Sequence, residues 1–483
     1  MDEDRASGAD RVRQTAGRWA SRWRVGPPES RSLWRRLTPP QLFVSSFGVL
    51  IAFGTIGLKT LPGLYTGEPL GWLDALFTAT SAVCVTGLIV VDTATYFTAA
   101  GQAFVLFLIQ LGGLGIITFT TVIILALGRR LSLRHEALAG AEIEIAEELD
   151  HARLARDIVR FTVVLEAAGA LLLYVLWVPR FGWGDAAWHA VFQAISAFCN
   201  AGFSTFSDSL MGFQEAPLSI LVIGVLIVLG GLGFIVLEEL YIRRGELRRT
   251  GSGRLSLHTR IVLFTSAILL LGAWILFALF EWRGALVDLG PGHRIINALF
   301  MSVTARTAGF NSIDYATAAD DTNFLTVILM SIGGSPGSTA GGLKTTTFAL
   351  IGLLALARLR GQRVVSIRGR TVPDETIQRA VGLFVLGFGV ITIAIFGYSH
   401  TELGGTPHGG QPFFDHMFEA VSAFNTVGLS LGATPDLSTT GRLLTILLMY
   451  VGRVGPLVFA AALARRAARV PTVRYSYEDV VIG

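Results

Sequence analysis

Charged residues are scarce in this 483-residue chain: Asp, Glu, Lys and Arg make up 15%, whereas a soluble domain carries roughly 25%. Only two of the cationic residues are lysines, Lys59 and Lys344. Hydrophobic residues make up 52%, and the mean hydropathy is +0.58. The shortage of charge excludes a soluble globular protein and predicts a protein with several membrane spans.

Cysteine is also scarce, since the chain has only Cys84 and Cys199. Both fall within apolar segments, so we expect neither a disulfide framework nor a cysteine metal site. No basic folded face indicates nucleic-acid binding. The Arg-rich residues 1–38 are not followed by a short apolar segment with a cleavage site. We therefore expect no signal peptide, and a mostly disordered cytoplasmic tail at this end.

Four short segments of the chain resemble one another. Each begins with a polar residue, carries Phe at the fourth place and ends in Gly followed by Leu or Phe. The third segment is one residue shorter than the others. The segments are Asp74–Leu88, His189–Phe203, Asn297–Phe310 and Asp415–Leu429.

Two long apolar stretches flank each of these segments, and about 20 helical residues cross a hydrocarbon core of roughly 30 Å. The short segments between them cannot cross, and they favour a re-entrant helix and loop lining a water-filled path. The sequence therefore predicts an all-α membrane protein with four pseudo-symmetric helix–pore-loop–helix repeats around one central pore. The eight predicted spans are 42–61, 102–127, 157–178, 216–241, 259–281, 323–358, 377–398 and 440–465.

The repeats predict how the chain is divided, and the arginines predict how it is oriented in the membrane. Arginines gather in three loops and near both termini, which the positive-inside rule places in the cytoplasm, so the short segments enter from outside. The basic loops are 129–134, 243–260 and 358–370. The predicted divisions are an N-terminal tail at 1–40, pore-loop repeats at 41–130, 131–245, 246–360 and 361–470, and a C-terminal tail at 471–483.

The four terminal glycines are candidates for a cation filter. Rings of backbone carbonyls can replace the hydration shell of potassium, and glycine permits the dihedral angles that such a path needs. We expect the pore helices to begin at Asp74, His189, Asn297 and Asp415, with their negative ends toward the pore centre. Hydrophobic hairpins whose glycines only allow close packing are the alternative, which fourfold recurrence disfavours. The predicted potassium-binding residues are Val85, Thr86, Gly87, Asn200, Ala201, Gly202, Thr307, Ala308, Gly309, Thr426, Val427 and Gly428.

The motifs TSAVCVTGL, SAFCNAGFS and TAGFNSID, together with the glycine-rich stretch 333–347, resemble the Trk/Ktr/HKT superfamily of potassium transporters. The resemblance covers roughly residues 40–483 and is greatest to KtrB-type subunits, because Trk-type proteins have additional N-terminal spans. It implies potassium uptake across the bacterial plasma membrane, a homodimer with one pore per subunit, and gating by a cytoplasmic nucleotide-binding ring of the KtrA type. The ending at 474–483 resembles tails that lie at the dimer interface in KtrB proteins.

The resemblance leaves sodium coupling, and so symport, open, and a sodium-permeable or Trk/HKT-like cation transporter is the alternative. Gly87 favours potassium, because some HKT proteins carry serine at this place. Sodium is the second candidate ion, and we expect no organic cofactor. No enzyme is expected, because no histidine lies in the middle of a span and Leu343 breaks the phosphate-loop pattern before Lys344.

The second span of the third repeat is interrupted by ten residues of which five are glycine and one is proline, a composition that cannot form a stable helix. The resemblance implies that this loop, at 333–346, blocks the pore. A packing kink with a snorkelling Lys344 is the alternative. Arg453, in the last span, is either a barrier to cations or paired with loop carbonyls, and both can hold. The predicted gating residues are Gly333, Gly334, Ser335, Pro336, Gly337, Ser338, Thr339, Gly341, Gly342, Lys344 and Arg453.

An acid follows each predicted filter segment within eight residues of its glycine. We interpret these acids as an outer vestibule that concentrates cations, with solvated loop acids or helix caps as an equal alternative. The acids are Asp92, Asp208, Asp314 and Asp436. Glu166, in the middle of a span, is expected to be paired or to face the interior of the bundle.

Overall fold

A computed structural model describes residues 39–115, 118, 151–244, 255–362, 364–367, 370–402 and 412–455. The side chains of residues 39–40 and 151–155 are not described. The predicted N-terminal and C-terminal tails lie almost entirely outside the described residues. The basic loop 129–134 and the ends of the second and eighth predicted spans also lie outside them.

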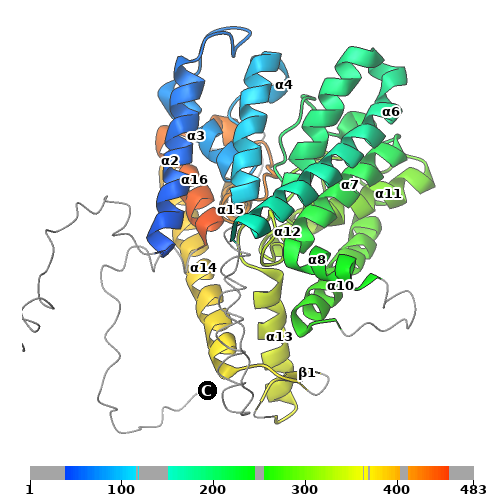
Figure 1. The fold of residues 1–483 in the computed structure, drawn as a ribbon, viewed down its shortest axis with the longest axis vertical. Coiled ribbons are helices and arrows are strands. Elements are labelled where there is room, and N and C mark those ends of the chain that lie inside the picture. Colours follow the sequence, from blue (N-terminus) through cyan, green and yellow to red (C-terminus); the bar gives the residue numbers. More distant parts are fainter. Residues whose placement is uncertain are drawn as a thin grey trace, which may run out of the picture.

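The described part of the chain is predominantly helical, and Figure 1 shows its arrangement. Helices α2, α3, α15 and α16 pack together on one side, and α6, α7 and α11 lie on the other. The helices are α2 (Pro39–Thr60), α3 (Trp72–Val83), α4 (Thr93–Tyr96), an unlabelled helix Ala99–Gly115, α6 (His151–Cys199), α7 (Pro217–Leu232), α8 (Phe234–Ile242), α10 (Leu257–Glu281), α11 (Pro291–Thr304), α12 (Asp320–Met330), α13 (Thr345–Leu359), α14 (Asp374–Thr401), α15 (Pro412–Phe424) and α16 (Thr439–Val454). Short 3-10 helices lie at Met211–Phe213 and Thr434–Asp436, and β1 (Ser366–Ile367) pairs antiparallel with β2 (Arg370–Thr371), Ser366 opposite Thr371.

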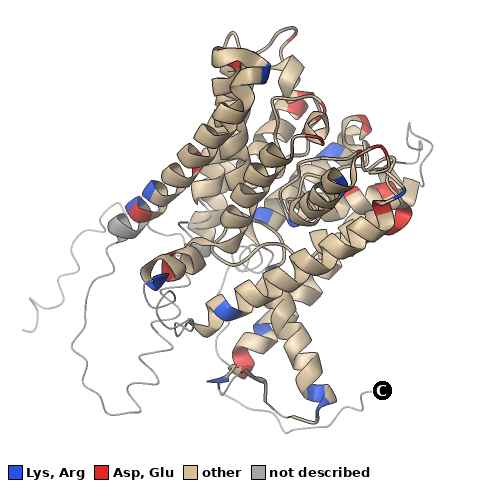
Figure 2. Cartoon of the chain, turned by 90° about the vertical axis from the view of Figure 1, so that its right-hand side faces the viewer, with Lys and Arg blue, Asp and Glu red and all other residues tan. Residues whose placement is uncertain are grey.

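Four of the described helices, α2, α6, α10 and α14, are long and apolar enough to cross a membrane. They correspond to the first predicted span of each repeat. Their outer faces carry exposed large apolar side chains such as Phe264, Leu279 and Ile393, which a bilayer would cover. Figure 2 shows long helical stretches without any Lys, Arg, Asp or Glu. The second helices are shorter or interrupted, so the full set of eight spans stays a prediction.

The predicted starts of the pore helices are wrong. Helix α3 begins at Trp72, α11 at Pro291 and α15 at Pro412. Proline has no backbone N–H to leave unpaired in the first turn, so Pro291 starts α11 more readily than Asn297 further on. In the second repeat the span and the predicted pore helix are two helical parts of α6, separated by a kink at Gly182, where φ is 76° and ψ is 175°; His189 lies inside the second part, seven residues after the kink.

The second helix of the second repeat is broken, although the sequence predicts one straight span at 216–241. Helices α7 and α8 meet at Gly233, where φ is 89° and the helix pair is bent by 100°. The elbow is filled by the glycine-rich stretch of the third repeat. A Cβ at Gly233 would lie 2.8 Å from the carbonyl oxygen of Pro336, and the N–H of Phe234 donates to the carbonyl of Gly337 at 3.0 Å. A contact with a distant segment therefore stabilises the bend.

The second helix of the third repeat is also interrupted. Helix α12 ends at Met330 and α13 begins at Thr345. The residues between them, including the glycine-rich stretch 333–342, are not helical. We refer to residues 333–344 as the glycine-rich loop.

Candidate cation-binding site

Each of the four repeated segments ends its helix in the same backbone conformation. A residue other than glycine has a positive φ two places before the terminal glycine, and the glycine itself also has a positive φ. Positive φ is uncommon for such residues and strained for β-branched ones, so its recurrence at one place indicates one shared loop conformation. The residues are Val85 (55°), Asn200 (59°), Thr307 (69°) and Thr426 (50°), followed by Gly87 (95°), Gly202 (70°), Gly309 (79°) and Gly428 (92°).

Hydrogen bonds close these turns, as is common where a helix ends in a left-handed residue. The N–H of the residue before the glycine donates to the carbonyl five residues earlier in three segments: Thr86 to Ser81 (2.8 Å), Ala201 to Ser196 (2.8 Å) and Val427 to Ser422 (2.9 Å). In the third segment the N–H of Ala308 donates to Thr304, only four residues earlier, at 3.1 Å. The shorter turn accounts for the residue that this segment lacks.

The four glycines form a closed ring, which we call the glycine ring. A Cβ added at Gly87 would lie 2.5 Å from the carbonyl oxygen of Ala201, which precedes the next glycine. The same contact recurs around the ring: Gly202 to the oxygen of Ala308 (3.0 Å), Gly309 to that of Val427 (2.4 Å), and Gly428 to that of Thr86 (2.1 Å). The contacts thus return to the first segment. A side chain in this ring would strike the backbone of the neighbouring segment.

Polar atoms at the ring lack hydrogen-bond partners among the residues that the structure describes. The hydroxyl groups of Thr86, Thr307 and Thr426 are buried, and they neither donate nor accept a hydrogen bond. An unsatisfied buried polar group costs about 1–3 kcal/mol, so these atoms suit a polar or ionic ligand. The side chain of Asn200 differs, because its amide nitrogen, in the orientation that satisfies it, donates to the carbonyls of Ala197 (3.0 Å) and Ile227 (3.1 Å). No cluster of His, Cys, Asp and Glu that could hold a metal occurs among the described residues.

Hydroxyl groups on the predicted pore helices brace the predicted filter segments, and the sequence analysis did not identify them. Ser81 and Ser422 accept from the N–H of Gly87 and Gly428, each at 3.1 Å. The corresponding residues of the other segments donate to the carbonyl after the glycine: Ser196 to Phe203 (2.6 Å) and Thr304 to Phe310 (2.7 Å). A Ser-Ala or Thr-Ala pair at the same place in all four segments is the signal that identifies them.

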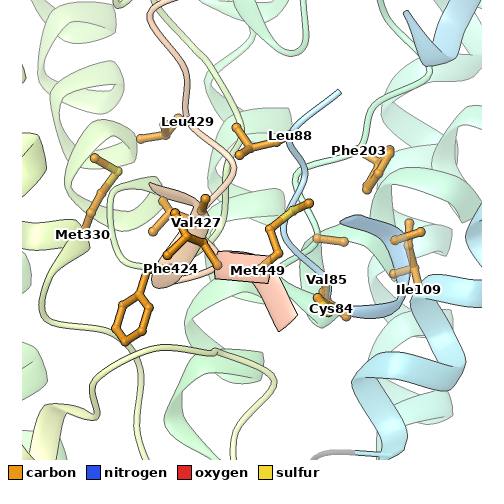
Figure 3. Packing of buried hydrophobic residues seen from close by; sticks show 14 of the residues in the cluster. Cys84, Val85, Leu88, Ile109, Phe203, Met330, Phe424, Val427, Leu429 and Met449 are labelled. Carbon is orange, nitrogen blue, oxygen red and sulfur yellow. The ribbon is translucent and has the colours of Figure 1, made fainter. Parts of the chain in front are cut away.

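The residue after each ring glycine packs into the apolar core. These side chains are at most 1% exposed: Leu88, Phe203, Phe310 and Leu429. Figure 3 shows Leu88, Phe203 and Leu429 around the filter segments, with Val427 and Met449 nearby. This close packing restricts movement of the loops, as a site selecting by ion size or coordination would need.

The glycine-rich loop is closed at its base. The N–H of Gly333 donates to the carbonyl of Leu343 at 2.8 Å, and the N–H of Thr345 to that of Gly334 at 3.0 Å. The hydroxyl of Thr345 also donates to the carbonyl of Gly333 at 2.7 Å. These three bonds, which we call the clasp, join the end of α12 to the start of α13.

The middle of the loop lies against the second and fourth repeats. On the second repeat, the N–H of Ser335 donates to Gly231 (3.0 Å) and the hydroxyl of Thr339 to Phe198 (3.3 Å). On the fourth, the N–H of Leu343 donates to Oδ1 of Asn425 at 3.2 Å. A Cβ at Gly341 would lie 2.1 Å from Oγ1 of Thr426, so the loop touches a predicted filter residue directly.

Two cations hold the loop, and we call them the lock cations. Arg453, 1% exposed, donates to the carbonyls of Thr339 and, at 3.2 Å, Gly112. Lys344 Nζ donates to the carbonyls of Ala340 (2.5 Å) and Gly341 (3.3 Å). Three successive loop carbonyls are thus bound by side chains of the third and fourth repeats. For Arg453 this is the pairing with loop carbonyls that the sequence left open.

A cavity of about 300 Å³ opens on the other face of the glycine ring. Its walls include all four ring glycines and three of the predicted acids, Asp92, Asp208 and Asp314, which we call the vestibule acids. Asp436 is not among the residues that line it. Asp92 also caps α4 by accepting from the N–H of Ala94 (3.1 Å), as the alternative expected. The loop contacts residues that precede the ring glycines, and the cavity is formed by those that follow.

Glu166 lies behind the second filter segment. It is 5% exposed and accepts from Nε2 of Gln110 at 3.1 Å, and the Sγ of the free Cys199 lies 3.9 Å from its Oε1. The expected pairing inside the bundle is therefore present. Since Cys199 directly precedes Asn200, this cluster supports a filter segment without lining the ring.

Residues 41–468 match the cation transport protein family TrkH. The chain belongs to this family. It is a transporter and not an enzyme, and the resemblance inferred from the motifs is confirmed. The solved structure of the potassium transporter TrkH from Vibrio parahaemolyticus has the same fold, with a TM-score of 0.73 at 20% identity, covering 91% of this chain and 87% of that one.

Curated relatives match almost the whole chain. The potassium/sodium uptake protein NtpJ of Enterococcus hirae is 38% identical over 93% of this chain and 98% of its own. The Ktr system potassium uptake protein B of Bacillus subtilis is 37% identical over 93% and 98%. Its counterpart from Vibrio alginolyticus is 39% identical over 92% and 95%.

Proposed function

We propose that this chain takes up potassium across the bacterial plasma membrane as the ion-translocating subunit of a Ktr-type system. The glycine ring is the observation that carries the proposal. Four segments converge so closely that only glycine fits, and each presents a backbone carbonyl beside its neighbour. The names of the Bacillus subtilis and Vibrio alginolyticus relatives support potassium as the ion.

In this proposal the predicted filter residues select the ion with backbone carbonyls. Carbonyl rings can replace the hydration shell of potassium, and the threonine hydroxyls without partners add oxygen atoms at the same level. The negative ends of the four pore helices point toward the ring and favour a cation. The vestibule acids would raise the local cation concentration at the outer mouth.

The glycine-rich loop is the proposed gate. It lies against a filter residue on the face of the ring opposite the cavity and is bound by the lock cations. Moving it would require these bonds to break while the clasp keeps the ends of the loop together. A change in α13, which begins directly after Lys344, or in α16, which carries Arg453, would therefore open or close the path.

The proposed assembly is a homodimer that binds a cytoplasmic nucleotide-binding ring of the KtrA type, with eight spans per subunit and both termini in the cytoplasm. The similarity to Ktr system proteins supports partner subunits. A sodium-permeable or Trk/HKT-like transporter is the second candidate, because the Enterococcus hirae relative is named for both potassium and sodium.

Growth rescue tests this function. The full chain is produced in cells that lack potassium uptake, alone and together with a KtrA-type ring protein, with and without sodium in the medium. Rescue at low potassium is expected, and dependence of the rate on sodium would indicate coupling. Absence of rescue in every combination, with the protein present in the membrane, would overturn the proposal.

A further inference from the structure

Arg306 is a cationic residue in the third filter segment, and the proposed filter and gate do not use it. It lies three residues before the ring glycine Gly309, a place that Cys84 and Asn425 occupy in the first and fourth segments. It is partly buried and lines a small cavity of about 20 Å³ together with Ser266 and Gly334. No carboxylate pairs with it among the residues that the structure describes.

The guanidinium of Arg306 joins three elements. Its Nη2 donates to Oγ1 of Thr345 at 3.2 Å and to Oγ of Ser266, in α10, at 3.4 Å. Thr345 is fully buried and forms two of the three bonds of the clasp. The third filter segment is thereby connected to the base of the glycine-rich loop.

The other three repeats brace their filter segments in a different way. A glycine of the second helix touches the carbonyl four places before the ring glycine, so that an added Cβ would lie within about 2 Å of it. The pairs are Gly112 with Val83 (2.0 Å), Gly230 with Phe198 (1.9 Å) and Gly452 with Phe424 (1.6 Å). In the third repeat the corresponding Gly333 instead faces the carbonyls of Gly341 and Leu343 in its own loop. The helix-to-filter contact is missing there, and Arg306 spans the gap.

We propose that Arg306 is a positioning residue that fixes the third filter segment to the clasp, so that ion selection depends on the clasp and not on the middle of the loop. The proposal rests on the function proposed above. Loss of the guanidinium frees the third segment of the ring, which lowers discrimination between potassium and sodium. Loss of a lock cation, in contrast, changes the rate and leaves the discrimination intact.

The test measures potassium and sodium uptake by the full-length protein reconstituted in lipid vesicles. R306Q and T345V are each expected to lower the ratio of potassium to sodium uptake about tenfold. The double variant is expected to be no worse than either single one, because the two residues act through one contact. R306K and T345S, which keep a donor and a hydroxyl, are expected to recover part of the ratio. R283Q, at an exposed arginine just after α10, is the matched control and should equal the wild type.

A wild-type ratio in R306Q or T345V, or additive losses in the double variant, would overturn the proposal. If R306Q does not reach the membrane in folded form, T345V, T345S and R306K decide the question by the same ratio. Wild-type protein that transports neither ion would refute the proposed function. Wild-type potassium uptake with an unchanged R306Q ratio would refute the role of Arg306 alone.

Discussion

Alanine substitutions in the glycine ring test whether these four residues form the ion path. The contact of a new Cβ with the neighbouring carbonyl oxygen is shortest at Gly428, at 2.1 Å, and longest at Gly202, at 3.0 Å. Ordinary contacts begin at 3.4 Å, so the carbonyl of Thr86 must move by roughly 1.3 Å in G428A, and that of Ala308 by only about 0.4 Å in G202A. The predicted order of severity is G428A, G309A, G87A and then G202A.

Backbone strain adds a cost that all four variants share. Positive φ in an L-residue is unfavourable by roughly 1–2 kcal/mol, and the ring glycines have φ between 70° and 95°. The carbonyl displacement differs among them and acts directly on the coordination of the ion. We expect the KM for potassium to rise at least about tenfold in G428A, equivalent to about 1.4 kcal/mol of lost ion binding, and about two- to threefold in G202A.

The assay is the initial rate of potassium uptake against potassium concentration in cells that lack other uptake systems. G352A and G382A are matched controls, because a Cβ at Gly352 in α13 or Gly382 in α14 meets no atom within 4 Å. Alanine favours a helix interior by roughly 0.5–1 kcal/mol, so both controls should transport normally. A larger effect in G202A than in G428A, or ring variants that match the controls, would refute the reasoning.

Three further predictions concern the surroundings of the ring. Neutralising a lock cation, as in K344Q or R453Q, is expected to raise the maximal uptake rate about three- to tenfold. Hydrogen bonds to a charged group contribute about 1.5–3 kcal/mol, and water replaces them in part when the charge is removed. An unchanged or lower rate would contradict the proposed gate. Changing all three vestibule acids to Asn is expected to slow uptake at low potassium and low ionic strength. The effect should disappear toward roughly 0.5 M salt, because salt screens the electric field of the carboxylates. D436N is the control and should leave uptake unchanged, since Asp436 does not line the cavity. G452A should reduce the folded protein recovered in detergent, because the new Cβ would lie 1.6 Å from the carbonyl oxygen of Phe424, while G115A, with no atom within 4 Å, should be recovered at the wild-type level.

The sequence predicted the family, the helical membrane class and the first helix of each repeat. These features depend on local composition and on repetition along the chain, which a sequence displays directly. Helix starts were less accessible, since Pro291 and Asn297 both favour a start and the helix begins at the proline. In α6 the break before the predicted pore helix lies at Gly182, seven residues before His189, so the polar residue that opens the repeat does not mark the start of the helix.

Features that depend on contacts between repeats could not be predicted from the sequence. The bend at Gly233 occurs in an apolar run typical of a continuous helix, and it forms where residues of the glycine-rich loop, about a hundred positions away, fill the elbow. The absence of Asp436 from the cavity and the link from Arg306 to Thr345 likewise arise from packing between segments distant in sequence. Periodicity and composition carry no signal for such pairs.

The ring and the loop differ in symmetry, and the second helices of the repeats explain the difference. These helices share a short motif, in which Gly113, Gly231, Gly334 and Arg453 occupy equivalent places. The carbonyls of Gly231 and Gly334 accept from the N–H groups of Ser335 and Thr345, so these two places hold the loop through the backbone.

In the fourth repeat the side chain of Arg453 reaches the loop and the first repeat together. Equivalent positions in the second, third and fourth repeats therefore contact the loop in different ways, through the backbone where the residue is glycine and through the side chain where it is arginine. Four nearly equal segments therefore form the ring, while a single loop from one repeat lies against it. Under the proposed function, substitutions in the ring weaken the binding of the ion, and neutralising Arg453 changes how fast the ion passes.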